Sequence, residues 1–172
     1  MWDPRTLGLD AAYPSHYYDQ FIGATKQVSF NGKAIKQLGG KLESIYRVES
    51  RPEHGCVVET VRKSHQNSDV KDKDLDVLVA EYSTKDGESL VMILNNHLAR
   101  CVLLDVKFIS QSVTELSADL TTSSPTLGYR NIKGDISLCA GDAKLFKIHT
   151  AYPTGCSKDF DDNNPKYLLT VI

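Results

Sequence analysis

Long apolar runs are missing from this chain of 172 residues, and no stretch approaches the roughly 20 apolar residues of a membrane span. An excess of charge of one sign is also missing, because 20 Lys and Arg face 22 Asp and Glu, giving a net charge of −2. Without a basic excess, the chain lacks the electrostatic signature of proteins that bind nucleic acid. The sequence therefore predicts neither a membrane span nor a nucleic-acid partner.

Motifs for catalysis and metal binding are missing as well. The sequence contains no C-x-x-C, no H-E-x-x-H and no G-x-S-x-G, and its five histidines are scattered without an i, i+4 pair. Two acidic segments, 69–76 and 159–164, lack the mid-loop Gly and the twelfth-position Glu of a calcium loop, so we interpret them as solvated loops. The sequence favours a non-enzyme that uses neither a cofactor nor a metal.

The length and composition fit one globular domain. A chain of this size falls in the usual range for a domain, and 41% hydrophobic residues suffice for a core. No internal repeat and no low-complexity linker divides the chain. We therefore expect a single β-rich domain over residues 1–172.

The cysteines bear on the compartment. The first residues lack the apolar core of a signal peptide, which leaves open an intracellular protein or a mature secreted chain. An even number of cysteines permits two disulfides in three connectivities, which the sequence does not rank. Cys101 and Cys139 each lie on the more polar face of their own predicted strand, which favours disulfides over core thiols. We expect a secreted protein, with a cytoplasmic one as the alternative, and the disulfide candidates are Cys56, Cys101, Cys139 and Cys156.

Strand patterns dominate the second half of the chain. Segments 76–82 and 89–94 are rich in β-branched and apolar residues, and the Asp86-Gly87 pair between them is a strong hairpin signal. Asn95 and Asn96 supply another turn, after which 98–110 reads as a third strand. These segments predict a three-strand antiparallel meander.

Further strands are expected downstream. Segments 134–140 and 144–150 flank Gly141-Asp142 and predict a second hairpin. Segment 112–120 fits both an alternating strand and a capped helix, and its β-rich neighbourhood favours the strand. A short final strand is expected over 166–172.

Helical periodicity is confined to the first third of the chain. Apolar residues recur at helical spacing over 33–46, but the Gly39-Gly40 pair falls inside this segment, which predicts a kinked or broken helix. Residues 15–21 form a second short candidate helix. The predicted fold is mainly β, an antiparallel meander forming a barrel or sandwich with one or two short N-terminal helices.

A group of aromatic residues near the N-terminus is the candidate contact site. Tyrosine combines a large apolar ring with a polar tip and is common at interfaces and pocket mouths. The alternative is a short helix that caps one end of the barrel. The candidate ligand- or partner-contacting residues are Tyr13, Tyr17, Tyr18 and Phe21.

The meander, the paired cysteines and the short N-terminal helical stretch resemble the lipocalin and wider calycin architecture. That resemblance implies an eight-strand barrel holding a small apolar ligand. The chain departs from the family because it has Gly23-Ala24-Thr25 where a lipocalin's first strand carries Gly-x-Trp. The resemblance covers the middle two-thirds of the chain and includes no family motif.

Segment 28–45 resembles the strand-to-helix junction of nuclear transport factor 2-like folds. This second resemblance implies an α+β cone with a pocket, used by transport adaptors and by small lyases or isomerases. The long first helix of that family is missing or heavily shortened here. The cone is therefore kept as the alternative fold.

Architecture and the missing motifs together predict what the protein does. We expect a secreted, non-enzymatic binding protein that uses a pocket or surface for a small apolar ligand or for a partner protein, as an effector does. A homo-oligomer whose apolar strands pack against a copy is a further hypothesis. The alternative function is the adaptor or small lyase/isomerase that the cone implies.

Overall fold

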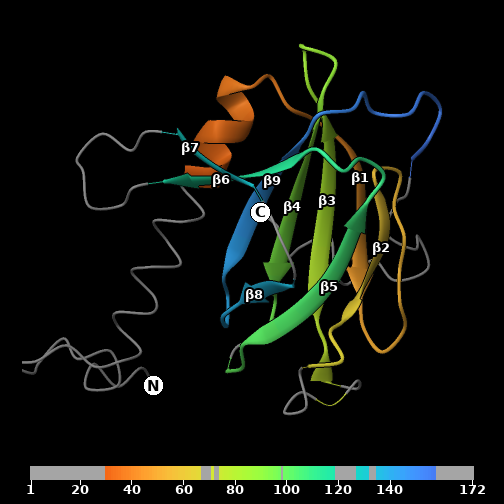
Figure 1. Ribbon diagram of the computed structural model, residues 1–172, viewed down its shortest axis with the longest axis vertical. Helices are drawn as coiled ribbons and strands as arrows, with labels where there is room; N and C mark the ends of the chain where they lie inside the picture. The colour runs from red at the N-terminus through yellow and green to blue at the C-terminus, as the bar shows by residue number, and fades with distance from the viewer. Residues whose placement is uncertain are drawn as a thin grey trace, which may run out of the picture.

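The protein is mainly β, as predicted, and its strands form two antiparallel sheets (Figure 1). The computed structural model describes residues 30–66, 71, 74–97, 99–118, 127–131 and 135–157. Within these residues the strands are β1 (Lys41–Val48), β2 (Val58–Lys63), β3 (Val77–Ser83), β4 (Ser89–Asn95), β5 (Val102–Phe108), β6 (Val113–Ala118), β7 (Leu127–Asn131), β8 (Ile136–Leu138) and β9 (Ala143–Ile148).

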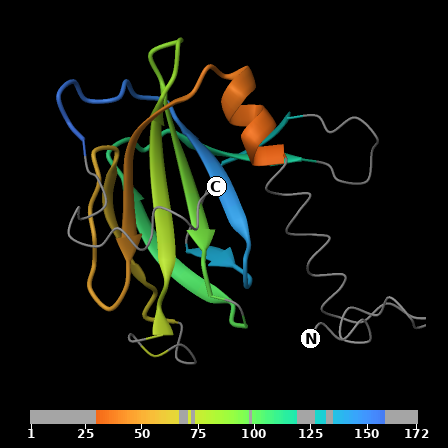
Figure 2. The same ribbon diagram turned by 180° about the vertical axis from the view of Figure 1, so that it is seen from behind.

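The two sheets lie face to face as a sandwich. The larger sheet has the strand order β1-β3-β4-β9-β6-β7, and the smaller one has the order β2-β5-β8. Figure 2 shows the larger sheet in front, with the orange helix over its outer side. Of the two predicted forms, barrel and sandwich, the described residues form the sandwich, and their ladders do not close into a barrel.

The main core lies between the sheets and consists of inward-facing residues from both. Alternation along β3 places Val77 and Val79 inward, and β4 contributes Val91 and Ile93 in the same way. All four side chains are fully buried. Removal of this apolar surface from water is the main stabilisation of the sandwich.

A second, smaller core lies on the outer face of the larger sheet. Phe30 and Ala34 from the helical residues 30–37 pack against Leu90 of β4, Leu116 of β6 and Leu145 of β9. The helix therefore covers the outer face over β4, β9 and β6. These strands therefore have buried apolar residues on both faces of the sheet, such as Leu90 on the outer face and Val91 on the inner one.

The prediction of a kinked or broken helix over 33–46 was wrong in its second half, which is strand β1. The helix ends before Gly39, which has a φ of 66°, and β1 begins two residues later. The N–H of Gly39 binds the carbonyl of Lys36 at 3.1 Å, and that of Gly40 binds the carbonyl of Ile35 at 2.8 Å. This is the Schellman pattern, so the glycine pair terminates the helix rather than kinking it.

The first predicted hairpin is confirmed, but the third strand of the meander was misplaced. β3 and β4 pair in register from Val77–Asn95 to Ser83–Ser89, and Gly87 of the turn has a φ of 75°. The next strand, β5, forms as expected but crosses to the other sheet, where it pairs with β2 and β8. The neighbour of β4 is β9 instead.

The second predicted hairpin was wrong in the same way. A turn does form around Gly141, but β8 pairs with β5 in the smaller sheet, whereas β9 pairs with β4 and β6 in the larger one. The strand interpretation of 112–120 is confirmed by β6. The predicted helix at 15–21 and strand at 166–172 lie outside the described residues.

These findings bear on both family resemblances. The described strands make a two-sheet sandwich, so the eight-strand barrel implied by the lipocalin resemblance is not what they form. The described residues do not form the α+β cone either, because among them the helix of residues 30–37 is accompanied by strands, turns and loops. Among the described residues, no helix has the length and apolar character required to cross a bilayer.

Candidate functional site

One end of the sandwich gathers several loops, and we call it the loop end. It comprises the β3–β4 turn (residues 84–88), the β5–β6 link (109–112), the segment after β9 (149–157) and Cys56. The β3–β4 turn and the segment after β9 lie at the upper end of the molecule in Figure 1. Backbone hydrogen bonds connect the β5–β6 link to its neighbours, since the N–H of His149 binds the carbonyl of Ser112 at 3.1 Å and the N–H of Ile109 binds the carbonyl of Val57, next to Cys56, at 3.1 Å.

A buried carboxylate joins the two sheets beneath the loop end. Glu81 of β3 is fully buried and points inward from the larger sheet. Its Oε2 accepts the backbone N–H of Cys56 at 2.8 Å, and its Oε1 accepts those of Val57 and Val58 at 3.2 and 3.1 Å. A buried carboxylate is tolerated only where donors replace its lost water, and the start of β2 supplies them here.

Two phenol groups complete the shell of donors around Glu81. Tyr46 of β1 donates to Oε1 at 3.2 Å, and Tyr152 from the segment after β9 donates to Oε2 at 3.2 Å. Burial, reinforced by the charge of Glu81, raises the pKa of Tyr46 far above its usual value. Burial also raises the pKa of Tyr152 to about 12, so both phenols stay protonated as donors at neutral pH.

Close backbone approach makes this arrangement possible. A Cβ added to Gly55 would lie closer than 3.0 Å to Oε1 of Glu81 and to the hydroxyl of Tyr46. A side chain at this position would therefore displace the carboxylate or the phenol. Glycine is needed at position 55 because it has no side chain, and the Glu81 carboxylate and the Tyr46 hydroxyl occupy the space that a Cβ would take.

A disulfide fixes the outer part of the loop end. Cys56, adjacent to this glycine, is bonded to Cys156 across 100 residues of sequence. The bond ties the start of β2 to the segment that carries Tyr152. It realises one of the pairings that the sequence left open, and the other two cysteine candidates carry free thiols.

Polar residues form a chain of contacts on the outer face of the larger sheet near the loop end. Glu88 binds the Nζ of Lys147 at 2.5 Å and the Nδ1 of His149 at 2.8 Å. The Nε2 of His149 lies 3.4 Å from the hydroxyl of Thr114. The contact to Lys147, with that to His149, holds the pKa of Glu88 below its usual range.

Acid, imidazole and hydroxyl thus follow one another in the order used by hydrolytic triads. The arrangement differs from such a site in one respect that matters for catalysis. Lys147 binds the same carboxylate as His149 and neutralises part of the negative charge of Glu88. We therefore interpret the chain of contacts as an ion-pair network that gives the surface of the loop end its polar character.

Apolar side chains are also exposed near this end. Ile109, at the start of the β5–β6 link, is 46% exposed, and Leu42, near the start of β1, is 50% exposed. These are the large hydrophobic residues most exposed among those the structure describes. The loop end therefore presents isolated apolar groups beside charged ones, a mixture typical of protein-binding surfaces.

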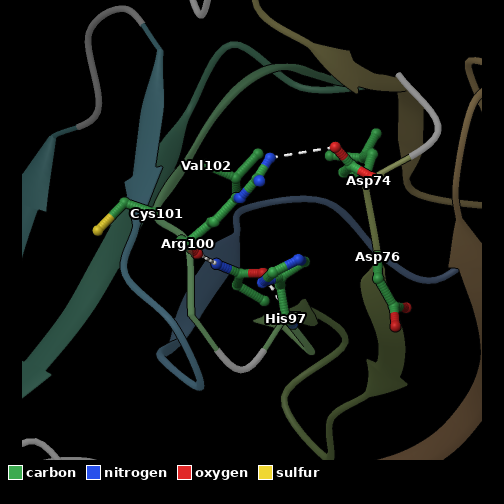
Figure 3. A pocket seen from close by; sticks show the side chains of 8 residues that line it. Asp74, Asp76, His97, Arg100, Cys101 and Val102 are labelled. Atoms are coloured by element: carbon green, nitrogen blue, oxygen red, sulfur yellow. Dashed lines mark hydrogen bonds and ion pairs between the residues drawn. The ribbon is translucent and has the colours of Figure 1, made fainter. Parts of the chain in front are cut away.

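A shallow depression lies at the opposite end of the sandwich (Figure 3). Arg100 and Asp74 border it and pair with each other at 3.1 Å, and His97 contributes a third polar wall. The space of about 170 Å³ within it is open to solvent, so the depression does not enclose a cavity for a small ligand. Its charged groups are already partnered, so it offers little to a ligand.

Asn95 organises the chain next to this depression. Its side chain is 1% exposed, and its Nδ2 donates to the carbonyls of Arg100, Leu138 and Cys139 at 2.8, 3.2 and 3.1 Å. The two crossings between the sheets, from β4 to β5 and from β8 to β9, both pass this side chain. Asn95 therefore joins the sheets at this end, as Glu81 does beneath the loop end.

The aromatic candidates Tyr13, Tyr17, Tyr18 and Phe21 lie outside the described residues. Sequence reasoning missed Glu81, although its position carried a signal. In the segment Val77–Ser83, Glu81 has the same parity as the inward-facing Val77 and Val79. An acidic residue on the buried face of a strand implies a set of donors, but the sequence does not show that β2 supplies them.

Comparisons with protein-family models, with curated proteins and with solved structures gave no match. Within the described part of the chain, no group of three or more His, Cys, Asp or Glu side chains is placed to hold a metal ion.

Proposed function

We propose that the protein is a secreted, non-enzymatic binding protein that contacts a partner protein through the loop end. The observation that carries the proposal is the double anchoring of this end by the Cys56–Cys156 disulfide and by Glu81. Loops fixed before binding lose less conformational entropy when a partner docks, so a fixed loop end favours tight recognition. Loops held at the end of a rigid sandwich are a common location for binding residues.

The disulfide also supports the proposed location. Disulfides persist in oxidising compartments and are rare in the cytosol. Cys56 is buried and its bond closes 100 residues of sequence, so the bond is part of the folded architecture. Secretion therefore accords better with this structure than the cytoplasmic alternative does.

A partner protein suits the structure better than a small apolar ligand held between the sheets. The side chains that point into that space include Phe146, Leu104 and Leu138, all fully buried by their neighbours. A ligand of lipocalin type would need that volume. The loop end instead carries the exposed Ile109 together with the polar His149 and the carboxylate of Glu88, a mixture that matches the surface of a protein-binding site.

Site-directed photocrosslinking tests this proposal. A photoreactive phenylalanine analogue is placed at Ile109 of the loop end and, as the matched control, at the exposed Ser137 of β8. Both proteins are incubated with extracellular fluid from the source organism. We expect one dominant crosslinked protein from position 109, suppressed by excess unlabelled wild type but not by excess Ile109→Glu.

Other outcomes contradict the proposal. Equal products from both positions mean that the surface is not selective, and no product at position 109 removes the loop end as the binding site. A crosslink to a second copy of the chain supports the homo-oligomer hypothesis instead. An apolar molecule that copurifies stoichiometrically in native mass spectrometry supports the small-ligand hypothesis.

A further inference from the structure

We propose that Cys101 and Cys139 form a redox-active dithiol pair that closes reversibly into a second disulfide at the end of the smaller sheet. The substrate class is a low-molecular-weight disulfide, with which the pair exchanges. This inference is independent of the loop end, because the two cysteines lie at the opposite end of the sandwich. It concerns thiol chemistry rather than recognition of a partner.

Strand register places the two thiols together. β5 and β8 pair antiparallel, with Val102 opposite Leu138, so the next residues outward along the ladder are Cys101 and Cys139. Their Sγ atoms are 2.9 Å apart. Directly opposed residues on antiparallel strands have Cβ atoms about 4.5–5.5 Å apart, close to the spacing that a disulfide requires.

Neighbouring backbone holds both cysteines in this arrangement. The buried Nδ2 of Asn95 donates to the carbonyl of Cys139 itself and to the carbonyl of Arg100, immediately before Cys101. One side chain therefore fixes the backbone at both members of the pair. The proximity of the thiols is a consequence of how the chain crosses between the sheets.

Exposure makes the pair reactive toward molecules in solution. Both cysteines are exposed, whereas Cys56 of the other pair is 8% exposed. Figure 3 shows the sulfur of Cys101 directed away from the depression, on the side of the strand opposite Val102. Exposed disulfides are the ones that small thiols reduce first, because the attacking thiolate reaches them.

The exchange takes two steps. The hydrogen bond with Cys101, together with burial, raises the pKa of Cys139 to about 11, so Cys139 stays a thiol near neutral pH. The thiolate of Cys101 attacks a disulfide R–S–S–R, forms Cys101–S–S–R and releases RS⁻. Cys139 then loses its proton, attacks the Cys101 sulfur and releases a second RS⁻. Two protein thiols are oxidised, one R–S–S–R is reduced to two R–SH, and the protons end on those thiols.

The test uses the full chain and oxidised glutathione as the disulfide. After incubation, free thiols are alkylated and the protein is mapped under non-reducing conditions. We expect a Cys101–Cys139 crosslinked peptide and an intact mass lower by two hydrogens. When reductant is added stepwise, we expect Cys101 and Cys139 to become alkylatable before Cys56 and Cys156 do.

The variant Cys139→Ser distinguishes two cases. In one, Cys139 displaces glutathione from Cys101, and in the other, the two thiols react independently. This variant should accumulate glutathione on Cys101, whereas the wild type should not, because Cys139 displaces the glutathione. Equal accumulation in both proteins contradicts the proposal. Two thiols that stay alkylatable in oxidised glutathione also overturn it, as does a crosslink of either cysteine to Cys56 or to a second copy of the chain.

Discussion

The carboxylate of Glu81 accepts the backbone N–H of Cys56 at 2.8 Å, and this contact joins the two sheets of the sandwich. Glu81 lies on β3 of the larger sheet, and Cys56 lies two residues before the start of β2 in the smaller one. The same cysteine is bonded to Cys156, so a hydrogen bond and a covalent bond act on one residue. We expect the loop end to be rigid, because both bonds act at this residue.

Replacing Glu81 with Gln should destabilise the protein strongly. The amide retains one oxygen but directs an N–H₂ group toward N–H and O–H donors, which then lose their acceptor inside the core. Hydrogen bonds to charged groups contribute about 1.5–3 kcal/mol each, so we expect the free energy of unfolding to fall by about 3 kcal/mol. Guanidinium unfolding measures it.

The matched control for that variant is Glu59→Gln, since Glu59 is exposed on β2. A surface change of this kind should alter the free energy of unfolding by less than about 0.5 kcal/mol. If the Glu81 variant is as stable as this control, the carboxylate does not hold the sheets together.

Two glycine-to-alanine substitutions should act in opposite directions. Gly55→Ala places a methyl group against the Glu81 carboxylate, so we expect a loss of about 2–3 kcal/mol from crowding in the core. Gly32 lies in the helix, and a Cβ added there would have nothing within 4 Å, so Gly32→Ala should gain about 0.5–1 kcal/mol. Thermal unfolding of both variants measures these changes in stability. Equal changes in the two variants would refute the close approach of the Gly55 backbone to Glu81.

Removing the Cys56–Cys156 disulfide should have a large effect on stability. The bond closes 100 residues of sequence, and for a loop of that length chain entropy in the unfolded state contributes about 4–5 kcal/mol. We expect the double variant Cys56→Ala with Cys156→Ala to lose about 4 kcal/mol in urea unfolding. A loss below about 1 kcal/mol would mean that the bond adds little to what Glu81 already fixes.

Stability should fall at alkaline pH because of the buried phenols. Folding raises the pKa of Tyr152 to about 12, and that of Tyr46 rises further, whereas unfolded tyrosine titrates near about 10. A pKa raised by folding gives stabilisation that is fully present below about pH 10 and is lost as the pH rises through the folded-state pKa.

Unfolding midpoints measured from about pH 8 to 12 test that dependence. The wild type should lose stability steeply above about pH 10, and Tyr152→Phe should lose it less steeply, because one titrating group is gone. The variant should also be less stable at neutral pH, since the hydrogen bonds to Glu81 and Ser44 are removed. Parallel pH profiles for the two proteins would exclude Tyr152 as a source of the alkaline loss.

The local features of the fold were readable from the sequence because they depend on neighbouring residues. The Asp86-Gly87 turn and its flanking strands form where the pattern placed them, and β6 follows its alternation. Cys101 and Cys139, which the alternation placed on polar faces, are exposed, although each lies just outside its strand and carries a free thiol. Period-2 alternation fixes the face of a strand without knowledge of its partner.

Strand partners were not readable, because they depend on contacts distant in sequence. The turns after Asn95 and around Gly141 look like hairpin turns, yet at both places the chain passes from one sheet to the other. The side chain of Asn95 holds both crossings together through carbonyls up to 44 positions away. No local pattern indicates such a contact, and the same holds for the donors around Glu81.

The rigidity of the loop end is measured most directly by native-state hydrogen exchange at the amides of Cys56, Val57 and Val58. All three donate to Glu81, so they should exchange only through global unfolding, as slowly as the core amides of β3 and β4. Fast exchange at these three amides, with β3 and β4 still protected, would contradict a loop end fixed before it binds.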